Sequence, residues 1–260
     1  MKDSRELDKD MYPTDSMGRT RDILAGLTIL GLAFLVQYLL RIALETSSWS
    51  EIILEDFASG TQIQARIVIL ILALVMVFHG TLATGTLLYF SRSDLPSKKV
   101  LWRGSASWIN LQLCAVGGIV LGTLYWFSVT EYLGRLPAGW ILRTKYAQPD
   151  AFVAIAQLVM AVGVSFSEEI FFRGLCFQFL CKRHGMVIGA LVSSVVFTVT
   201  HYPSASDWLA LAPWLFVVSV ILCWTYWKLG FLSSAIAVHA AINISILFYS
   251  YWYLNRSLGI

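Results

Sequence analysis

Two adjacent carboxylates and an arginine interrupt a strongly apolar stretch of this chain. Residues 165–174 read SFSEEIFFRG, which places Glu168, Glu169 and Arg173 among aromatic and aliphatic side chains. A charge at the centre of a bilayer costs roughly 2.5–3.5 kcal/mol on insertion scales, so such groups indicate a role. Glu169 and Arg173 are four residues apart and can pair on one helix face. Because neighbouring residues of a helix point about 100° apart, this pair does not explain Glu168, which we interpret as functional.

Two histidines and an asparagine lie in the apolar segments that follow. Residues 197–201 read FTVTH and end at His201, and residues 239–243 read HAAIN. The four-residue spacing places His239 and Asn243 on one face of a helix, one turn apart. Both side chains can therefore address the same point.

Together these side chains form an inventory for the attack of water on an amide. A carboxylate acts as a general base when its pKa lies near the working pH, and two neighbouring carboxylates titrate as a coupled pair. Arg173 would help to keep one of them ionised. Imidazole and carboxamide groups aimed at a developing oxyanion supply the electrostatic complement. A lone histidine in an apolar segment is interpreted as a hydrogen-bonded packing residue, and this is our interpretation of His79.

The residues required by three other intramembrane protease chemistries are missing from the sequence. No histidine is followed by glutamate, so the His-Glu-x-x-His zinc motif is absent. No aspartate lies within an apolar segment, as a paired-aspartate enzyme requires, and the one Ser-Gly pair, Ser59-Gly60, lies in an acidic polar segment. Glutamate-dependent chemistry is what these exclusions favour.

Three motifs, in this order on successive apolar segments, resemble those of the CPBP family of membrane proteases. The motifs are Glu168-Glu169-x-x-x-Arg173, Phe197-x-x-x-His201 and His239-x-x-x-Asn243. The family includes the type II (Rce1-like) CAAX prenyl endopeptidases and bacterial homologues linked to bacteriocin processing or immunity. The resemblance covers about 150–253, and the earlier apolar segments are similar in hydropathy alone.

The resemblance implies a role for each matched residue. Glu168 would be the base that activates water, and His201 would hold the same water. His239 and Asn243 would form the pair that stabilises the oxyanion. The residues that would organise the site are Glu169, Arg173 and Phe197.

The elements that position these residues are long apolar helices. Hydrophobic residues make up 57% of the 260 residues and charged residues 13%, and the mean hydropathy is +0.68. Apolar windows near twenty residues long suit a helix that crosses about 30 Å of hydrocarbon, whereas the strands of a barrel alternate. We predict an all-α, polytopic transmembrane bundle of about seven helices, or eight with a short or tilted one. The predicted helices are 23–44, 67–90, 105–129, 152–181, 187–203, 209–227 and 231–253.

The predicted organisation has four parts. They are a cytosolic amino-terminal tail at 1–22, transmembrane helices and loops at 23–149, the catalytic core at 150–253 and a carboxyl-terminal tail at 254–260. With the amino terminus in the cytosol, twelve Lys and Arg residues fall on the cytosolic side and six on the other, which favours this orientation. The site is then expected to open toward the cytosol. The net charge is +3, but the basic residues lie at helix ends rather than along one face, so we expect no nucleic-acid partner.

The hypothesis from the sequence is an intramembrane glutamate-type endopeptidase. It would hydrolyse a peptide bond in a lipidated, CAAX-like substrate or in another membrane-associated protein or peptide. The resemblance implies no obligatory cofactor, although glutamate, two histidines and asparagine form a set that zinc accepts in principle, so zinc stays an alternative. A non-proteolytic scaffold or bacteriocin-immunity factor and an ion-coupled transporter are the alternative functions. Without an organellar signal, we expect the chain in a prokaryotic plasma membrane.

Overall fold

All the elements that the structure describes are helices. The structure is a computed structural model, and it describes residues 17–45, 63–92, 106–132, 151–201 and 208–258. The α-helices are α2 (Met17–Glu45), α4 (Ile63–Arg92), α6 (Trp108–Phe127), α7 (Ala151–Phe171), α8 (Gln178–Thr200), α9 (Trp208–Leu229) and α10 (Leu232–Leu258). Two π-helical segments are η1 (Ser128–Tyr132) and η2 (Phe172–Phe177). Five predicted segments each coincide with one described α-helix. The segment predicted at 152–181 spans α7, η2 and the start of α8, and the one predicted at 187–203 falls mostly in the rest of α8. The prediction of an all-α bundle is confirmed for the described residues.

The outermost helices extend into the predicted tails. α2 begins at Met17 and α10 continues to Leu258, so part of each tail predicted at 1–22 and 254–260 is helical. The other residues of both tails lie outside the described ranges. Most polar residues are tolerated in a helix at little cost in stability, so both helices extend beyond their apolar segments.

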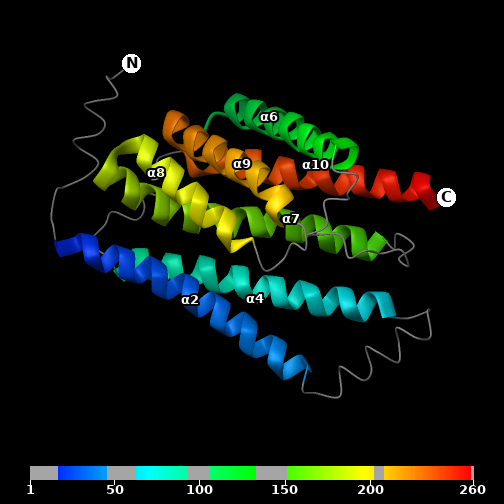
Figure 1. The fold of residues 1–260 in the computed structure, drawn as a ribbon, viewed down its shortest axis with the longest axis horizontal. Coiled ribbons are helices and arrows are strands. Elements are labelled where there is room, and N and C mark those ends of the chain that lie inside the picture. The colour runs from blue at the N-terminus through cyan, green and yellow to red at the C-terminus, as the bar shows by residue number, and fades with distance from the viewer. Residues whose placement is uncertain (1–16, 46–62, 93–105, 133–150, 202–207, 259–260) are drawn as a thin grey trace.

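α7 lies at the centre of the bundle. It packs between α4 on one side and α10 on the other, as Figure 1 shows. α2 packs against α4, α6 packs against α10, and α8 and α9 pack against each other. The buried apolar core is built from α2, α4, α6, η2 and α7 to α10, so it encloses the region where α7 ends. This arrangement places the glutamate-bearing helix where three other helices can reach it.

Five described stretches are long and apolar enough to cross a membrane. They are Ala73–Arg92, Trp108–Thr130, Ala154–Thr200, Leu211–Leu229 and Leu232–Tyr253. The apolar part of α2, Leu24–Leu40, is shorter. Large aliphatic side chains such as Leu113 and Val159 are exposed on the outside of the bundle, where hydrocarbon would cover them. These features make the chain an integral membrane protein.

The connection from α7 to α8 is continuous until a break at Gly185. α7 passes through η2 into α8, and Gly185 then adopts φ 82° and ψ 168°, a conformation that glycine reaches without the penalty of a Cβ. The break follows the basic residues 182–184, where the sequence predicted a helix end. Residues 186–200 make a helix of about 22 Å, shorter than about 30 Å of hydrocarbon, in keeping with the short segment predicted there.

Candidate active site

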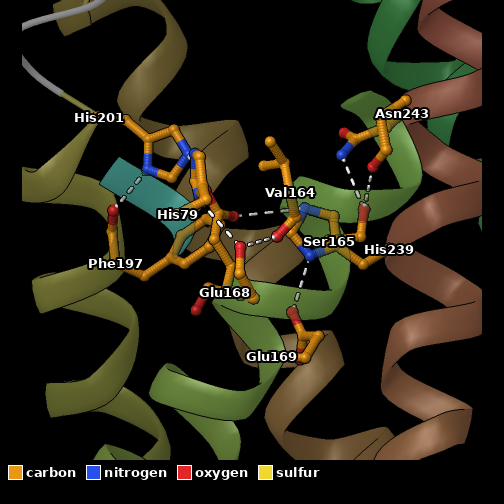
Figure 2. A network of polar contacts seen from close by, with 12 residues as sticks. His79, Val164, Ser165, Glu168, Glu169, Phe197, His201, His239 and Asn243 are labelled. Carbon is orange, nitrogen blue, oxygen red and sulfur yellow. Dashed lines mark hydrogen bonds and ion pairs between the residues drawn. The ribbon is translucent and has the colours of Figure 1, made fainter. Parts of the chain in front are cut away.

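Glu168 lies near the carboxyl end of α7 and points into the bundle. Its side chain is 6% exposed, and its Oε2 atom has no hydrogen-bond partner among the described residues. Burying a carboxylate without partners is costly, so a group in this position is held there by the surrounding fold. Its neighbours come from three other helices, as Figure 2 shows.

Three imidazoles surround the Glu168 carboxylate. The Nε2 atoms of His79 and His201 each lie 3.8 Å from Oε1, and the Nε2 atom of His239 lies 3.7 Å from Oε2. His79 comes from α4, His201 follows the last residue of α8, and His239 comes from α10. These separations exceed direct hydrogen-bond lengths, and each is short enough for a single water to bridge with two hydrogen bonds of about 2.8 Å.

The backbone of α8 fixes the orientation of His201. The Nδ1 atom lies 2.7 Å from the carbonyl oxygen of Phe197, one turn earlier. A carbonyl only accepts, so Nδ1 carries the hydrogen, and Nε2 of the neutral imidazole presents a lone pair to Glu168. The Phe197 ring lies tilted against the imidazole, with 4.5 Å between centroids, and the Arg173 guanidinium lies 4.9 Å from the same ring. Phe197 therefore connects the second motif to the first by packing.

Glu169 joins the arginine to the third motif. Its Oε1 atom accepts a hydrogen bond of 2.9 Å from Nη1 of Arg173 and lies 2.7 Å from Nδ1 of His239. Nη2 of Arg173 also donates to the hydroxyl and carbonyl oxygens of Ser219 on α9, at 2.9 and 3.2 Å. The same-face pair predicted from the spacing is thus present, and it is fully buried. Arg173 lies in η2, a π-helical turn of the kind that often accompanies functional sites.

His239 and Asn243 contact different residues of α7. The Asn243 amide donates a hydrogen bond of 3.0 Å to the Ser165 hydroxyl, which itself donates to the carbonyl oxygen of Ala161 at 2.8 Å. Ser165 lies about one helical turn before Glu168 on α7. Both residues of the third motif therefore face α7. His239 contacts Glu169, whereas Asn243 contacts Ser165, about one helical turn nearer the start of α7, as seen in Figure 2.

The sequence interpretation missed three contributors to this network. His79 was interpreted as a packing residue, yet its imidazole lies beside Glu168, and the hydroxyls of Ser165 and Ser167 hold Asn243 and His79. The available signal for His79 was its position among apolar residues in a membrane helix, where polar groups often mark a site. No local pattern showed which face of α4 meets α7.

The described side chains do not form a metal site. No group of three or more His, Cys, Asp or Glu residues in the described ranges is arranged to hold an ion. Ligand atoms of tetrahedral zinc lie about 3.3 Å apart, given metal–ligand bonds near 2.0 Å, whereas the imidazoles here lie 3.7–3.8 Å from the carboxylate oxygens. The fourth member of the expected zinc set, Asn243, is directed to Ser165. The donor set does not fit zinc, and we derive no step through a metal.

Comparison with known proteins finds a family match for the part of the chain that carries these motifs. Residues 150–245 match the family described as type II CAAX prenyl endopeptidase Rce1-like. No curated protein and no solved structure matches the chain significantly. The match contains all three motifs and the helices α7, α8 and α9 with the first half of α10. It indicates a protease of the CAAX type. Over residues 150–245 the chain is therefore similar to the Rce1-like, type II CAAX prenyl endopeptidase family, the family that its three motifs resemble.

Proposed function

We propose that the protein is an intramembrane glutamate-type endopeptidase that hydrolyses a peptide bond of a lipidated, CAAX-like or otherwise membrane-associated substrate. The observation that carries this proposal is the buried Glu168 carboxylate with three imidazole nitrogens 3.7–3.8 Å from its oxygens. A buried carboxylate among hydrogen-bonding side chains in an apolar helix is typical of a functional site rather than of packing.

The first step is the activation of water by Glu168 and His201. A water between them donates one hydrogen to Oε1 of Glu168 and the other to the lone pair on Nε2 of His201. Glu168 takes the first hydrogen as a proton while the oxygen attacks the amide carbon. The protonated carboxyl group then gives this proton to the nitrogen of the leaving amine, so Glu168 returns to its starting state.

The second step is the stabilisation of the oxyanion by His239 and Asn243. The Nδ1–H of His239 is committed to Glu169, so its Nε2 donates to an oxyanion only when both ring nitrogens are protonated. In that state the charges of Glu168, Glu169, Arg173 and His239 sum to zero, which limits the cost of burying them. The Asn243 amide gives one of its two hydrogens to Ser165 and has the other for the substrate.

The first experiment tests the role of Glu168. The purified protein in lipid nanodiscs would be given a quenched fluorescent CAAX-type peptide, in prenylated and unprenylated forms. We expect Glu168→Gln to lower kcat by about 10²–10⁴-fold, the usual contribution of a general base. Val162→Ala is the matched control, because Val162 lies on the same helix and is 43% exposed. Equal cleavage by both variants would contradict the proposal.

The same assay tests the metal-independent mechanism. We expect a zinc chelator to leave the wild-type rate unchanged, since the described donors do not fit a zinc ion. Loss of cleavage with the chelator and recovery with added zinc would favour the metal alternative. The two peptides also separate the substrate classes, because a large preference for the prenylated form supports recognition of lipid.

A non-proteolytic scaffold on the same fold makes the opposite prediction. In that case Glu168→Gln and His201→Ala would leave the cellular phenotype of the gene intact. We further propose a prokaryotic plasma membrane with the amino terminus in the cytosol and a site that opens to the cytosol, in line with the distribution of Lys and Arg. Cleavage only of bonds presented from the outer side would contradict this orientation.

A further inference from the structure

His79 reaches the site from a part of the chain that the family match does not include. It lies in the middle of α4, whereas the match covers residues 150–245. Its side chain is 11% exposed, and its Nε2 atom is as close to Glu168 Oε1 as that of His201, at 3.8 Å. None of the three motifs assigns a role to this third imidazole.

Ser167 orients the His79 imidazole. The Ser167 hydroxyl oxygen lies 3.0 Å from Nδ1 of His79 and 2.9 Å from the carbonyl oxygen of Val164. The hydroxyl has a single hydrogen, and the carbonyl can only accept, so both contacts are hydrogen bonds when Ser167 donates to Val164 and accepts from His79. The hydrogen of the neutral imidazole is then on Nδ1, and Nε2 presents a lone pair.

The lone pair of His79 faces another acceptor. Oε1 of ionised Glu168 accepts hydrogen bonds but donates none, so it cannot bond directly to a bare Nε2 nitrogen. A donor with two hydrogens satisfies both atoms, and water spans 3.8 Å with two ordinary hydrogen bonds. A carboxylate oxygen accepts two hydrogen bonds, so Oε1 has room both for a water at His79 and for the nucleophilic water proposed at His201.

We propose that His79 is a positioning residue of the active site that holds a second water against Oε1 of Glu168. This bridge fixes the rotation of the carboxylate, so that the second lone pair of Oε1 faces the nucleophilic water at His201. No covalent bond to His79 forms, and its proton count does not change. The inference rests on the proposed function, since it assigns Oε1 as the atom that accepts the proton.

Three substitutions of His79 separate this role from packing. His79→Gln places an amide oxygen near the former Nε2 atom and keeps an acceptor for the bridging water. In His79→Asn the shorter amide still reaches Ser167 but provides no acceptor near Glu168. His79→Leu keeps the volume of the side chain but has no polar atom. We expect kcat to fall about 10–100-fold in the Asn and Leu variants, with KM unchanged, and to stay within about threefold of wild type in the Gln variant, because misplacing a reacting group by about 1 Å has effects of this size.

The control variants use the same assay in nanodiscs. Met76→Leu is the matched control on α4, because Met76 lies one turn before His79 and is 49% exposed. Wild-type kcat in His79→Asn, or equal losses in the Gln and Leu variants, would overturn the proposal. If Glu168→Gln cleaves as fast as wild type, the proposed function itself fails. The two failures are therefore distinguishable.

A second measurement does not depend on cleavage. Nitrogen-15 NMR of the purified protein with labelled histidine reports which ring nitrogen carries the hydrogen, and His79→Gln identifies the signal. We expect the His79 hydrogen on Nδ1 and a bare Nε2, with a shift of the Nε2 signal in Glu168→Gln. A hydrogen on Nε2 would overturn the proposal, because His79 would then be a donor toward Glu168.

Discussion

The helices before residue 150 and those after it bury different kinds of side chain. Among the described residues, Thr86 is the one buried polar side chain of the first region, whereas the second region buries a network of charged groups and hydroxyls around Glu168. Buried polar groups are costly unless they are paired, so they accumulate where a site requires them. The second region therefore holds most of the candidate site, and the first mainly supplies packing.

His79 qualifies this division. It is part of α4 but contacts Ser167 and lies beside Glu168, so the site extends into the first region. The family match covers residues 150–245 and so leaves out α4, the helix that packs on one side of α7 and carries His79. A family signature locates reacting groups, whereas the groups that orient them come from any helix that packs against the site.

The largest expected effect comes from breaking the buried charge network of the second region. Arg173→Met leaves Glu169 buried without its guanidinium partner, which costs about 3–5 kcal/mol in comparable buried pairs. The double variant Glu169→Gln with Arg173→Met removes both charges and should be less destabilised. Arg183→Met is the control, because Arg183 is exposed on α8. The melting temperatures of the three variants are measured by thermal unfolding in the same detergent. Equal melting temperatures for Arg173→Met and Arg183→Met would rule out a stabilising role for the buried pair of Arg173 and Glu169.

A smaller effect is expected from substitutions of Asn243 and of its hydrogen-bond partner Ser165. If its second amide hydrogen stabilises the oxyanion, Asn243→Ala should lower kcat by about 10²–10³-fold with little change in stability. Ser165→Ala removes only the anchor of the amide, so its loss of kcat should be clearly smaller. The peptide assay compares the two variants. A loss in Ser165→Ala as large as that in Asn243→Ala would mean that Asn243 acts by holding α10 against α7.

Local spacing predicted much of this arrangement. The pairing of Glu169 with Arg173 follows from their separation of four residues within one helix, and the structure contains that pair. The separate direction of Glu168 follows from helical geometry in the same way. His201 and His239 were expected near Glu168 because three motifs resembled one family, and both imidazoles lie beside it.

The other features depend on contacts between helices. His79 reaches Glu168 because one face of α4 packs on α7, which no local period encodes. Asn243 shares a helix face with His239 as predicted, but its direction is set by Ser165, a residue of another helix. The break at Gly185 lies between the predicted segments 152–181 and 187–203, while the π-helical turn η2 inside the first of them was not predicted.

The smallest effect tests the packing role of the first region at the contact of α6 with α10. A Cβ atom at Gly118 would lie 2.4 Å from the carbonyl oxygen of Val238, one residue before His239, so Gly118→Ala forces α6 and α10 apart. Overpacking of this kind costs about 1–3 kcal/mol. Gly117→Ala is the matched control, since its Cβ would meet no atom within 4 Å beyond its chain neighbours and the backbone of its own helix. We expect Gly118→Ala to lower the melting temperature and to reduce kcat modestly through displacement of His239. A stable Gly118→Ala variant with unchanged kcat would mean that α6 does not help to position the third motif.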